Sequence, residues 1–235
     1  MLALVFVWPL AASIVASFQR DGAWTLANYE TVRRLYAGDV AYTVGVAAAG
    51  TALTFAAAIP ACGWLRLRAF GPVEFLLKIP LFVPFVVVGH ALRVFWSPYV
   101  PGFASSWAGI ASALAWKHVG LAALLLLGAF RALDESYLEA ARQLGAGPAR
   151  LTRDILVPMA GPALAVSAIL IFSSMLASFS IPLMMGRGGG PQMLMIDVYY
   201  RFGQHGDFPT ASALGVVAYL LAMGAALVYI RRLTR

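Results

Sequence analysis

Six hydrophobic segments alternate with polar stretches along this chain. They occupy residues 1–18, 41–65, 75–95, 107–130, 162–185 and 208–230. Each is long enough for an α-helix to cross the hydrocarbon core of a bilayer, which takes about 20 mostly apolar residues. The pattern predicts an all-α integral membrane protein with six transmembrane helices.

Two of these segments carry signals about their packing. The second is rich in glycine and alanine, small residues that allow membrane helices to approach one another closely. The third contains Pro80, Pro84 and Gly89, and proline inside a helix removes a hydrogen bond and kinks the backbone. We expect the third helix to be kinked or locally unwound, which a membrane tolerates only where protein or a cavity surrounds the backbone.

The polar stretches are expected to lie outside the membrane. Residues 19–40 are predicted to form an extramembrane connection because they hold Arg20, Asp21, Glu30, Arg33, Arg34 and Asp39. Residues 97–106 are expected to form a turn, and residues 193–202 a short interfacial helix. We divide the chain into residues 1–39, a first transmembrane helix with an external loop, and residues 40–235, the core transmembrane domain.

The polar stretch with the most signals for helix starts and stops is residues 134–158, between the fourth and fifth hydrophobic segments. Ser136 and Glu139 have the spacing of a capping box, so a short helix is expected to begin near Ser136. Gly145 suits the left-handed residue that closes a helix, and Pro148 suits the first position of a second helix, which is expected to stop by Val157, just before a proline. The first helix is expected to have one apolar face, made of Tyr137, Leu138, Ala141 and Leu144.

The composition supports insertion into a membrane. Of the 235 residues, 61% are hydrophobic and 11% are charged, and the mean hydropathy is +0.81. Soluble proteins rarely have such values. The net charge of +7 is assigned to Lys and Arg retained on the cytoplasmic side, and not to nucleic-acid binding. The single Cys62 allows no internal disulfide.

The basic residues also predict the orientation. If both termini and residues 134–158 share one side of the membrane, that side holds Arg66, Arg68, Lys78, Arg131, Arg142, Arg150, Arg153, Arg231, Arg232 and Arg235. The other side then holds Arg20, Arg33, Arg34, Arg187 and Arg201. Positive residues concentrate on the cytoplasmic side, so both termini and this polar segment are expected in the cytoplasm.

The segment resembles a known motif. The matching residues are Glu139, Ala140, Ala141 and Gly145, followed by Ile155, Pro158 and Pro162. Their spacing is similar to that of the "EAA" loop of binding-protein-dependent ABC importer permeases, the family of the maltose, molybdate, sulfate and polyamine importer membrane subunits. It is a variant, because Leu144 stands where many members carry Asp, and Val157 where Leu commonly precedes Pro158. Residues 24–29 similarly resemble an element that follows the first helix in that family; the alternative is an aromatic anchor at the membrane interface.

The resemblance implies a type I ABC importer (MetI-like) permease fold in the bacterial inner membrane. It also implies that residues 134–158, the coupling segment, dock on a separate ATPase subunit that binds ATP and Mg²⁺ in place of this chain. The further implied partners are a second permease subunit, an extracytoplasmic solute-binding protein and membrane lipid, with no nucleic acid. The residues assigned to coupling are Ser136, Glu139, Ala140, Ala141, Leu144, Gly145, Ile155 and Pro158.

Basic residues inside the spans are candidates for the translocation pathway. Lys117 and Arg93 fall within predicted spans, and such residues normally face a bundle interior or water. If Lys117 lies on the pathway, it would favour an anionic or polar solute over a polyamine. The alternatives to a pathway role are that its ammonium snorkels to the membrane interface or that it contacts a neighbouring subunit. His90 and His118 are expected to be satisfied interior histidines, because no second set of metal ligands accompanies them. The other candidates are Pro84, Phe179 and Pro182, the last two in a stretch that resembles the family's pathway-facing region.

The alternatives to a permease subunit are a self-contained secondary transporter and a membrane-embedded enzyme. A self-contained secondary transporter predicts detectable internal halves and deep ionisable partners, and neither is visible in the sequence. A membrane-embedded enzyme needs clustered catalytic groups; the best cluster, residues 197–207, lacks an evident nucleophile and base, so no catalytic residue and no cofactor is assigned to the chain. With residues 187–191, that cluster is instead a hypothetical contact surface for the binding protein.

Overall fold

The computed structural model describes residues 2–68, 70–186 and 189–233. Its helices are α1 (Leu2–Ser17), α2 (Ala27–Arg68), α3 (Gly71–Phe82), α4 (Phe85–Trp96), α5 (Trp107–Arg131), α6 (Glu135–Gln143), α7 (Pro148–Arg150), the π-helical turn η1 (Leu151–Leu156), α8 (Val157–Met159), α9 (Gly161–Leu176), α10 (Ser180–Met185), α11 (Leu194–Gly203) and α12 (Phe208–Leu233). A small exception to the all-α expectation is a hairpin of strands β1 (Gln19–Arg20) and β2 (Ala23–Trp24).

The six predicted hydrophobic segments are recognisable in this architecture. α2, α5 and α12 are each long and apolar enough to cross a membrane. Two further candidates are bent pairs: α3 with α4 at 104°, and the helix Pro148–Met159 with α9 at 80°. The remaining segment, residues 1–18, corresponds to α1, an apolar helix of 16 residues.

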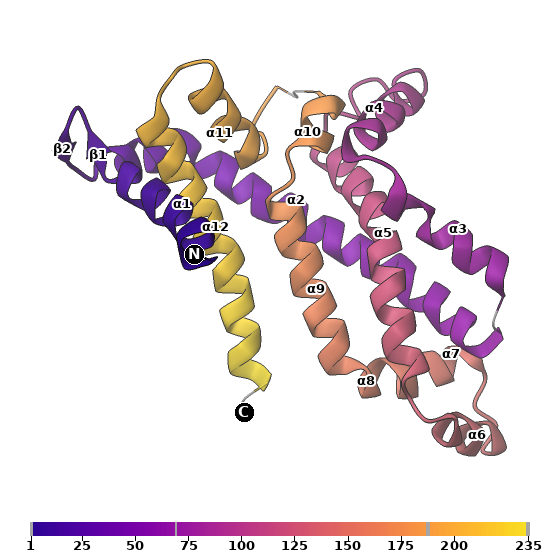
Figure 1. Cartoon of the computed structure of the whole chain (residues 1–235). Helices are drawn as coiled ribbons and strands as arrows, with labels where there is room; N and C mark the ends of the chain where they lie inside the picture. Colours follow the sequence, from indigo (N-terminus) through magenta and orange to yellow (C-terminus); the bar gives the residue numbers. More distant parts are fainter. Residues whose placement is uncertain (1, 69, 187–188, 234–235) are drawn as a thin grey trace.

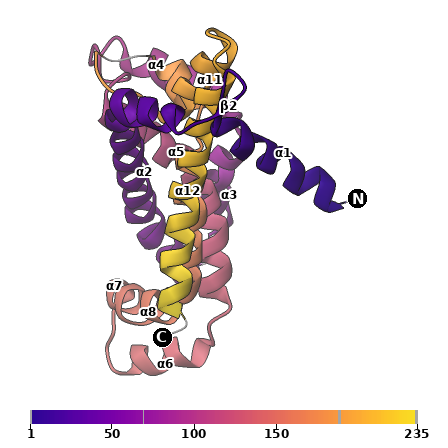
Figure 2. The same ribbon diagram turned by 90° about the vertical axis from the view of Figure 1, so that its left-hand side faces the viewer.

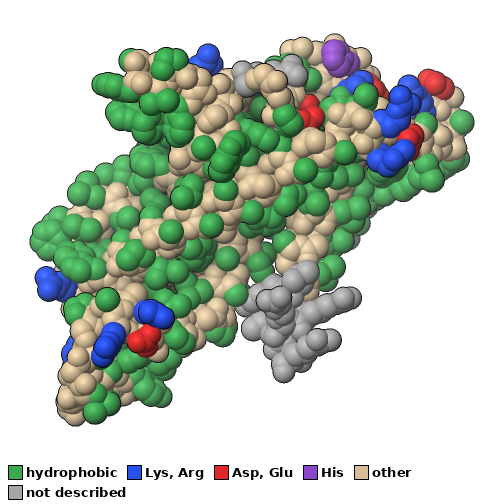
Figure 3. Space-filling view, turned by 180° about the vertical axis from the view of Figure 1, so that it is seen from behind, with side chains coloured by type: hydrophobic (Ala, Val, Ile, Leu, Met, Phe, Trp, Pro, Cys, Tyr) green, Lys and Arg blue, Asp and Glu red, His purple; other side chains and the backbone are tan. Residues whose placement is uncertain are grey.

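The helices run between two polar ends of an elongated molecule (Figure 1). One end carries the hairpin, α4, α10 and α11, and the other carries α6, α7 and α8. α5 lies between α3 and α9 with α2 behind it, while α1 leans away from the body beside α12 (Figure 2). In the space-filling view, Lys and Arg side chains gather at the two ends of a broad hydrophobic surface (Figure 3). This distribution fits a molecule whose middle is in lipid and whose ends are in water.

Residues 27–40 are helical and form the first part of α2. The extramembrane position of residues 19–40 stays a prediction. The chain reverses in the hairpin, because Asp21 and Gly22 have φ values of 50° and 79°, as a tight two-residue turn requires. The proposed boundary at residues 39 and 40 falls inside α2.

Asn28 and Tyr29, within the stretch that resembles a family element, tie α2 to α1. The buried Asn28 side chain donates to the Ser17 carbonyl at 2.9 Å and the Gln19 carbonyl at 3.0 Å. The Tyr29 and Ser17 hydroxyls lie 2.7 Å apart.

The expected close packing of small residues is confirmed in α2. A Cβ atom on Gly50 would lie 2.8 Å from the sulfur of Met175 in α9. A Cβ on Gly63 would lie 2.4 Å from the side chain of Thr152 in η1. α2 therefore contacts both the bundle and the coupling segment through glycines.

Two spans are broken, and only one break was expected. The predicted irregularity of the third span is confirmed as a break at Val83 and Pro84, between α3 and α4. The fifth hydrophobic segment was predicted as one span, but α9 ends at Leu176 and α10 begins at Ser180. Several serines, including Ser173, Ser174 and Ser178, stand close to this break, but serine does not by itself end a helix. Pro182 does not predict the break, because proline is tolerated in the first turn of a helix, where N–H groups have no helical partner.

Candidate functional site

The coupling segment begins differently from the capping box that the sequence suggested. Asp134 is the N-cap of α6, and its Oδ1 accepts a hydrogen bond from the Ser136 backbone N–H at 2.9 Å. This bond and a second one from the Ser136 side chain lower the pKa of Asp134. Among the residues that the structure describes, Glu139 is exposed and has no hydrogen bond or ion pair. The prediction of a capping box was wrong because Asp134, two residues before Ser136, is an equally good N-cap.

The end of α6 matches the prediction for Gly145. Its φ is +81°, its N–H donates to the Arg142 carbonyl at 2.9 Å, and the Ala146 N–H donates to the Ala141 carbonyl at 3.0 Å. This pair of bonds is the Schellman arrangement, which needs a left-handed residue at the position of Gly145.

The expected single apolar face of α6 is divided between two sides. Leu138 is fully buried, and Ala141 is partly buried. Tyr137 is 54% exposed and Leu144 90% exposed. The helix therefore uses one apolar side for the protein body and presents other apolar side chains to the outside.

The second helix of the coupling segment continues past the point where it was expected to stop. It runs from Pro148 to Met159 and then bends by 80° into α9. The wide turn η1 lets it pass Pro158: the Val157 N–H donates to the Thr152 carbonyl, five residues earlier, and this irregular bonding accommodates a residue that has no N–H of its own. Ile155 is partly buried and Pro158 is exposed.

Arg66 of α2 attaches the coupling segment to the body, a role that the sequence did not reveal. Its guanidinium donates to the carbonyls of Phe130 at 2.9 Å and Leu133 at 3.2 Å, and lies 2.6 Å from Glu135 Oε2. Glu135 also accepts from Arg142 at 2.9 Å. The Arg66 side chain is 14% exposed and the Glu135 side chain 43%, so water reaches this ion pair from the side of Glu135.

Glu135 is expected to give the coupling segment a dependence on pH. Hydrogen bonds from Arg66 and then Arg142 lower the pKa of Glu135, so the ion pair stabilises the fold above the ordinary glutamate pKa of about 4.3 and is lost as the pH falls through the lowered value. Amide hydrogen exchange in residues 136–143, corrected for intrinsic rates, should therefore accelerate below about pH 4.

The matched pair of variants is Glu135→Gln and Glu139→Gln. Glu135→Gln should show the faster exchange already at neutral pH and a smaller acid step, which then comes from protonation of the Asp134 cap. Glu139→Gln, on the same helix, should behave as the wild type. Equal behaviour of the two variants would contradict the role of Glu135.

At the opposite end, α4 packs on α10. A Cβ on Gly89 would lie 2.8 Å from Met184 Cβ and 2.9 Å from the Ile181 carbonyl, so the helices touch at their backbones. Arg93 is exposed and donates to the Met184 carbonyl at 3.3 Å. The structure thus brings two predicted pathway elements together, although Arg93 points along the surface of this contact.

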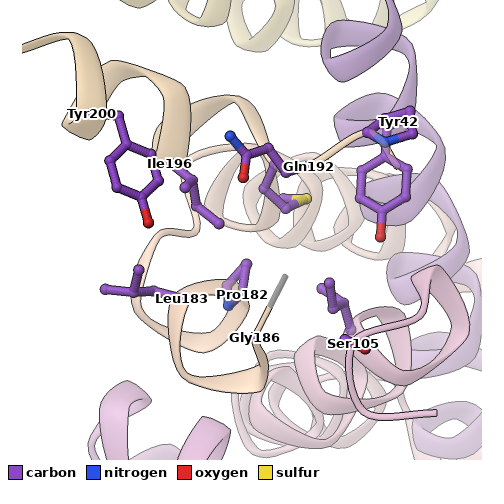
Figure 4. A pocket seen from close by; sticks show the side chains of 11 residues that line it. Tyr42, Ser105, Pro182, Leu183, Gly186, Gln192, Ile196 and Tyr200 are labelled. Carbon is purple, nitrogen blue, oxygen red and sulfur yellow. The ribbon is translucent and has the colours of Figure 1, made fainter. Parts of the chain in front are cut away.

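The remaining pathway candidates lie around the same contact. Pro84 is exposed directly before α4, and Phe179 directly before α10 has its ring centroid 5.1 Å from that of Tyr199. Pro182 is buried and lines a cavity of about 50 Å³ between α10 and the approach to α11 (Figure 4). This volume is well below the roughly 300 Å³ of a pocket for a drug-sized ligand. The assignment of these residues to a pathway stays a prediction.

A larger polar cavity of about 500 Å³ lies beside it, between α2 and α11. It contains part of the polar cluster considered above: Asp197 Oδ1 accepts from the Gln192 side chain at 2.5 Å, and Arg201 donates to the Tyr36 hydroxyl at 2.5 Å. These contacts join the cluster to Gln192 and to Tyr36 of α2. Within the described residues, no group of three or more His, Cys, Asp or Glu side chains is arranged to hold a metal ion.

Lys117 and the two histidines have different surroundings from one another. Lys117 is 6% exposed, and its ammonium donates to three backbone carbonyls of the α3–α4 break. His118 is buried with both ring nitrogens in contact, at 2.8 Å from the Leu114 carbonyl and 3.0 Å from the Ser174 hydroxyl, so its prediction as a satisfied interior histidine is confirmed. His90 is exposed, and the same prediction was wrong for it, because it lies on the outer face of α4.

The chain has relatives among known proteins. A family model described as "Binding-protein-dependent transport system inner membrane component" matches residues 50–234. The chain is 32% identical over 130 residues to the Sulfoquinovosyl glycerol transport system permease protein SmoG of Agrobacterium fabrum, across 54% of this chain and 42% of that protein. It is 30% identical over 158 residues to the Molybdenum transport system permease protein ModB of Azotobacter vinelandii, across 61% of this chain and 70% of that protein. The match thus covers less than half the length of the first relative.

A solved structure shares the fold. It is that of a bacterial alginate ABC transporter in complex with an alginate pentasaccharide-bound periplasmic protein, and the match has a TM-score of 0.74 at 16% identity. The superposition covers 99% of this chain and 91% of the other. At this identity the likeness concerns the fold alone.

Proposed function

Because the chain belongs to the family of binding-protein-dependent transport system inner membrane components, we propose that it is the membrane-spanning permease subunit of an ABC importer. Its helices form part of the solute pathway. The coupling segment docks on a separate ATPase subunit and passes on the movement of that subunit.

The observation that carries the proposal is the construction of the coupling segment. Leu138 is buried in the body while Leu144, at the tip of α6, is 90% exposed. Two residues of α2 hold this segment: Arg66 through the ion pair with Glu135, and Gly63 through close packing on the Thr152 side chain. Tyr137 and Leu144 are both exposed on this segment, and we assign them to the contact with the ATPase subunit.

The proposed partners follow from this role. Two ATPase subunits bind ATP and Mg²⁺ and grip the coupling segments of two permease subunits, which are identical or different. An extracytoplasmic binding protein delivers the solute at the end that carries the hairpin, α4 and α11. The chain itself performs no catalysis in this proposal, since ATP hydrolysis resides in the ATPase chains.

We place the protein in the bacterial inner membrane, with several crossings and both termini in the cytoplasm. The support is the excess of Lys and Arg expected on the side of the coupling segment, together with the hydrophobic surface between the two polar ends (Figure 3).

The proposed solute is polar or anionic. This follows the first two relatives, whose names specify sulfoquinovosyl glycerol and molybdenum. Lys117 adds no support in this conformation, because its ammonium is engaged by backbone carbonyls.

Copurification tests the proposal against a self-contained secondary transporter. The tagged chain, co-expressed with a candidate ATPase subunit, should retain that subunit in detergent. The complex with its binding protein, reconstituted in liposomes, should take up one of the probes molybdate and sulfoquinovosyl glycerol only with ATP. An ATPase variant that lacks its P-loop lysine should stop this uptake. Uptake by the chain alone, driven by an ion gradient, would replace the proposal with the secondary transporter.

A further inference from the structure

The break between α3 and α4 leaves backbone carbonyls that no helix can satisfy. The last carbonyls of a helix have no partner within it, and α3 ends at Phe82. The following chain offers little, because Pro84 has no N–H and α4 leaves at 104° to α3. In the apolar middle of a membrane protein such carbonyls need a donor from elsewhere.

Lys117 on α5 supplies this donor. Its Nζ lies 2.8 Å from the Pro80 carbonyl, 3.0 Å from that of Leu81 and 2.7 Å from that of Val83. An ammonium has three N–H groups, so each carbonyl can receive one. The ammonium also lies 4.6 Å from the ring centroid of Phe85, the first residue of α4, a favourable cation–π distance. Positive charge at the C-terminal end of α3 is favourable too.

The next residue of α5 holds the other broken span. His118 bonds to the Ser174 hydroxyl of α9 at 3.0 Å, and α9 ends two residues further on, at Leu176. Adjacent side chains of one unbroken helix thus contact both broken spans just before their breaks. Beyond the breaks, α4 and α10 pack on each other through Gly89 and Arg93.

We propose that Lys117 is a positioning residue whose ammonium replaces the missing backbone donors at the α3–α4 break, and so fixes the angle at which α4 and the attached α10 lie. In consequence α4 and α10 keep a defined place over the outer end of α5 while the coupling segment moves at the other end. The transport consequence rests on the proposed function; the structural consequence does not.

The test compares Lys117→Met with Lys78→Met in the full chain in lipid nanodiscs. Met keeps the length of Lys without the three donors. Lys78 lies in α3 itself, but its ammonium bonds to the Glu74 carboxylate at 2.6 Å and not to the break. Lys117→Met should accelerate amide hydrogen exchange of residues 88–93 in α4 at least tenfold, while Lys78→Met leaves it at the wild-type rate.

Two outcomes would overturn the proposal. One is wild-type exchange of α4 in Lys117→Met. The other is an acceleration spread equally over α2, α5 and α9, which would mean a general loss of packing.

A second readout concerns the assembled importer. In the complex with its ATPase, Lys117→Met should keep ATP hydrolysis but lose most of the uptake, a separation that general misfolding does not produce. Loss of both in proportion would count against the positioning role. If the wild-type chain binds no ATPase, the proposed function fails, yet the exchange experiment still decides the role of Lys117.

Discussion

Valine in place of Gly145 is expected to abolish copurification of the chain with its ATPase subunit, while the variant still inserts into the membrane. The φ of Gly145 is +81°, which a β-branched residue adopts only with strain on the order of 1–3 kcal/mol. No atom lies within 4 Å of an added Cβ, so steric contact contributes nothing. The strain falls on the turn that presents Leu144 between α6 and α7.

Two variants control for this result. Gly145→Asn should keep the complex, because asparagine tolerates the left-handed conformation. Gly147→Val places the same side chain two residues away, where φ is −77° and there is also no contact within 4 Å, and it should keep the complex as well. If Gly145→Val binds the ATPase as tightly as Gly147→Val does, the turn is not needed for docking.

Alanine in place of Gly63 is expected to uncouple ATP hydrolysis from uptake. The added Cβ would lie 2.4 Å from both Cγ2 and Oγ1 of Thr152, so η1 must move away from α2. Overpacking of this kind typically costs about 1–3 kcal/mol. We expect the ATPase to remain bound and to hydrolyse ATP, with uptake in liposomes reduced at least tenfold, because the coupling segment then moves without carrying α2.

Substitution of Thr152, the partner of Gly63 in this contact, provides the control. Thr152→Ala removes the two atoms at 2.4 Å and leaves only Cβ, at 3.0 Å from the new methyl group, so the double variant should regain a large part of the uptake. Gly45→Ala, in the same helix with no atom within 4 Å, should have little effect. A double variant as inactive as Gly63→Ala would show that the contact between α2 and η1 is not the cause.

Features encoded by neighbouring residues could be predicted from the sequence. The hydrophobic segments follow from their length and composition. The break at Pro84 and the turn at Gly145 follow from the backbone restrictions of proline and the freedom of glycine. For these features, the signal and the structure lie within a few residues of each other.

Features that depend on distant partners could not be predicted. Arg66 of α2 meets Glu135, the first residue of α6, and Lys117 meets carbonyls more than 30 residues earlier. In the sequence, Lys117 resembles a pathway residue because a lone charge in an apolar span has no visible partner. The carbonyls that it binds become unsatisfied only through the angle between α3 and α4. The second break, after Leu176, likewise follows packing against α4 and α11, and no proline or glycine marks it.

The continuous helical stretch Pro148–Met159 (α7, η1 and α8) meets α9 at an 80° bend, so the two segments form a lever with two arms. The 12 residues of Pro148–Met159 give an arm of about 18 Å, at 1.5 Å per residue. A displacement of about 3 Å at Pro148, perpendicular to that arm, would turn the elbow by roughly 10° if the helix stays straight. α9 is of similar length, so its far end, next to the second break, would swing by a comparable distance. A small displacement of the coupling segment would thus rotate α9 and move the end of α9 that lies next to α10.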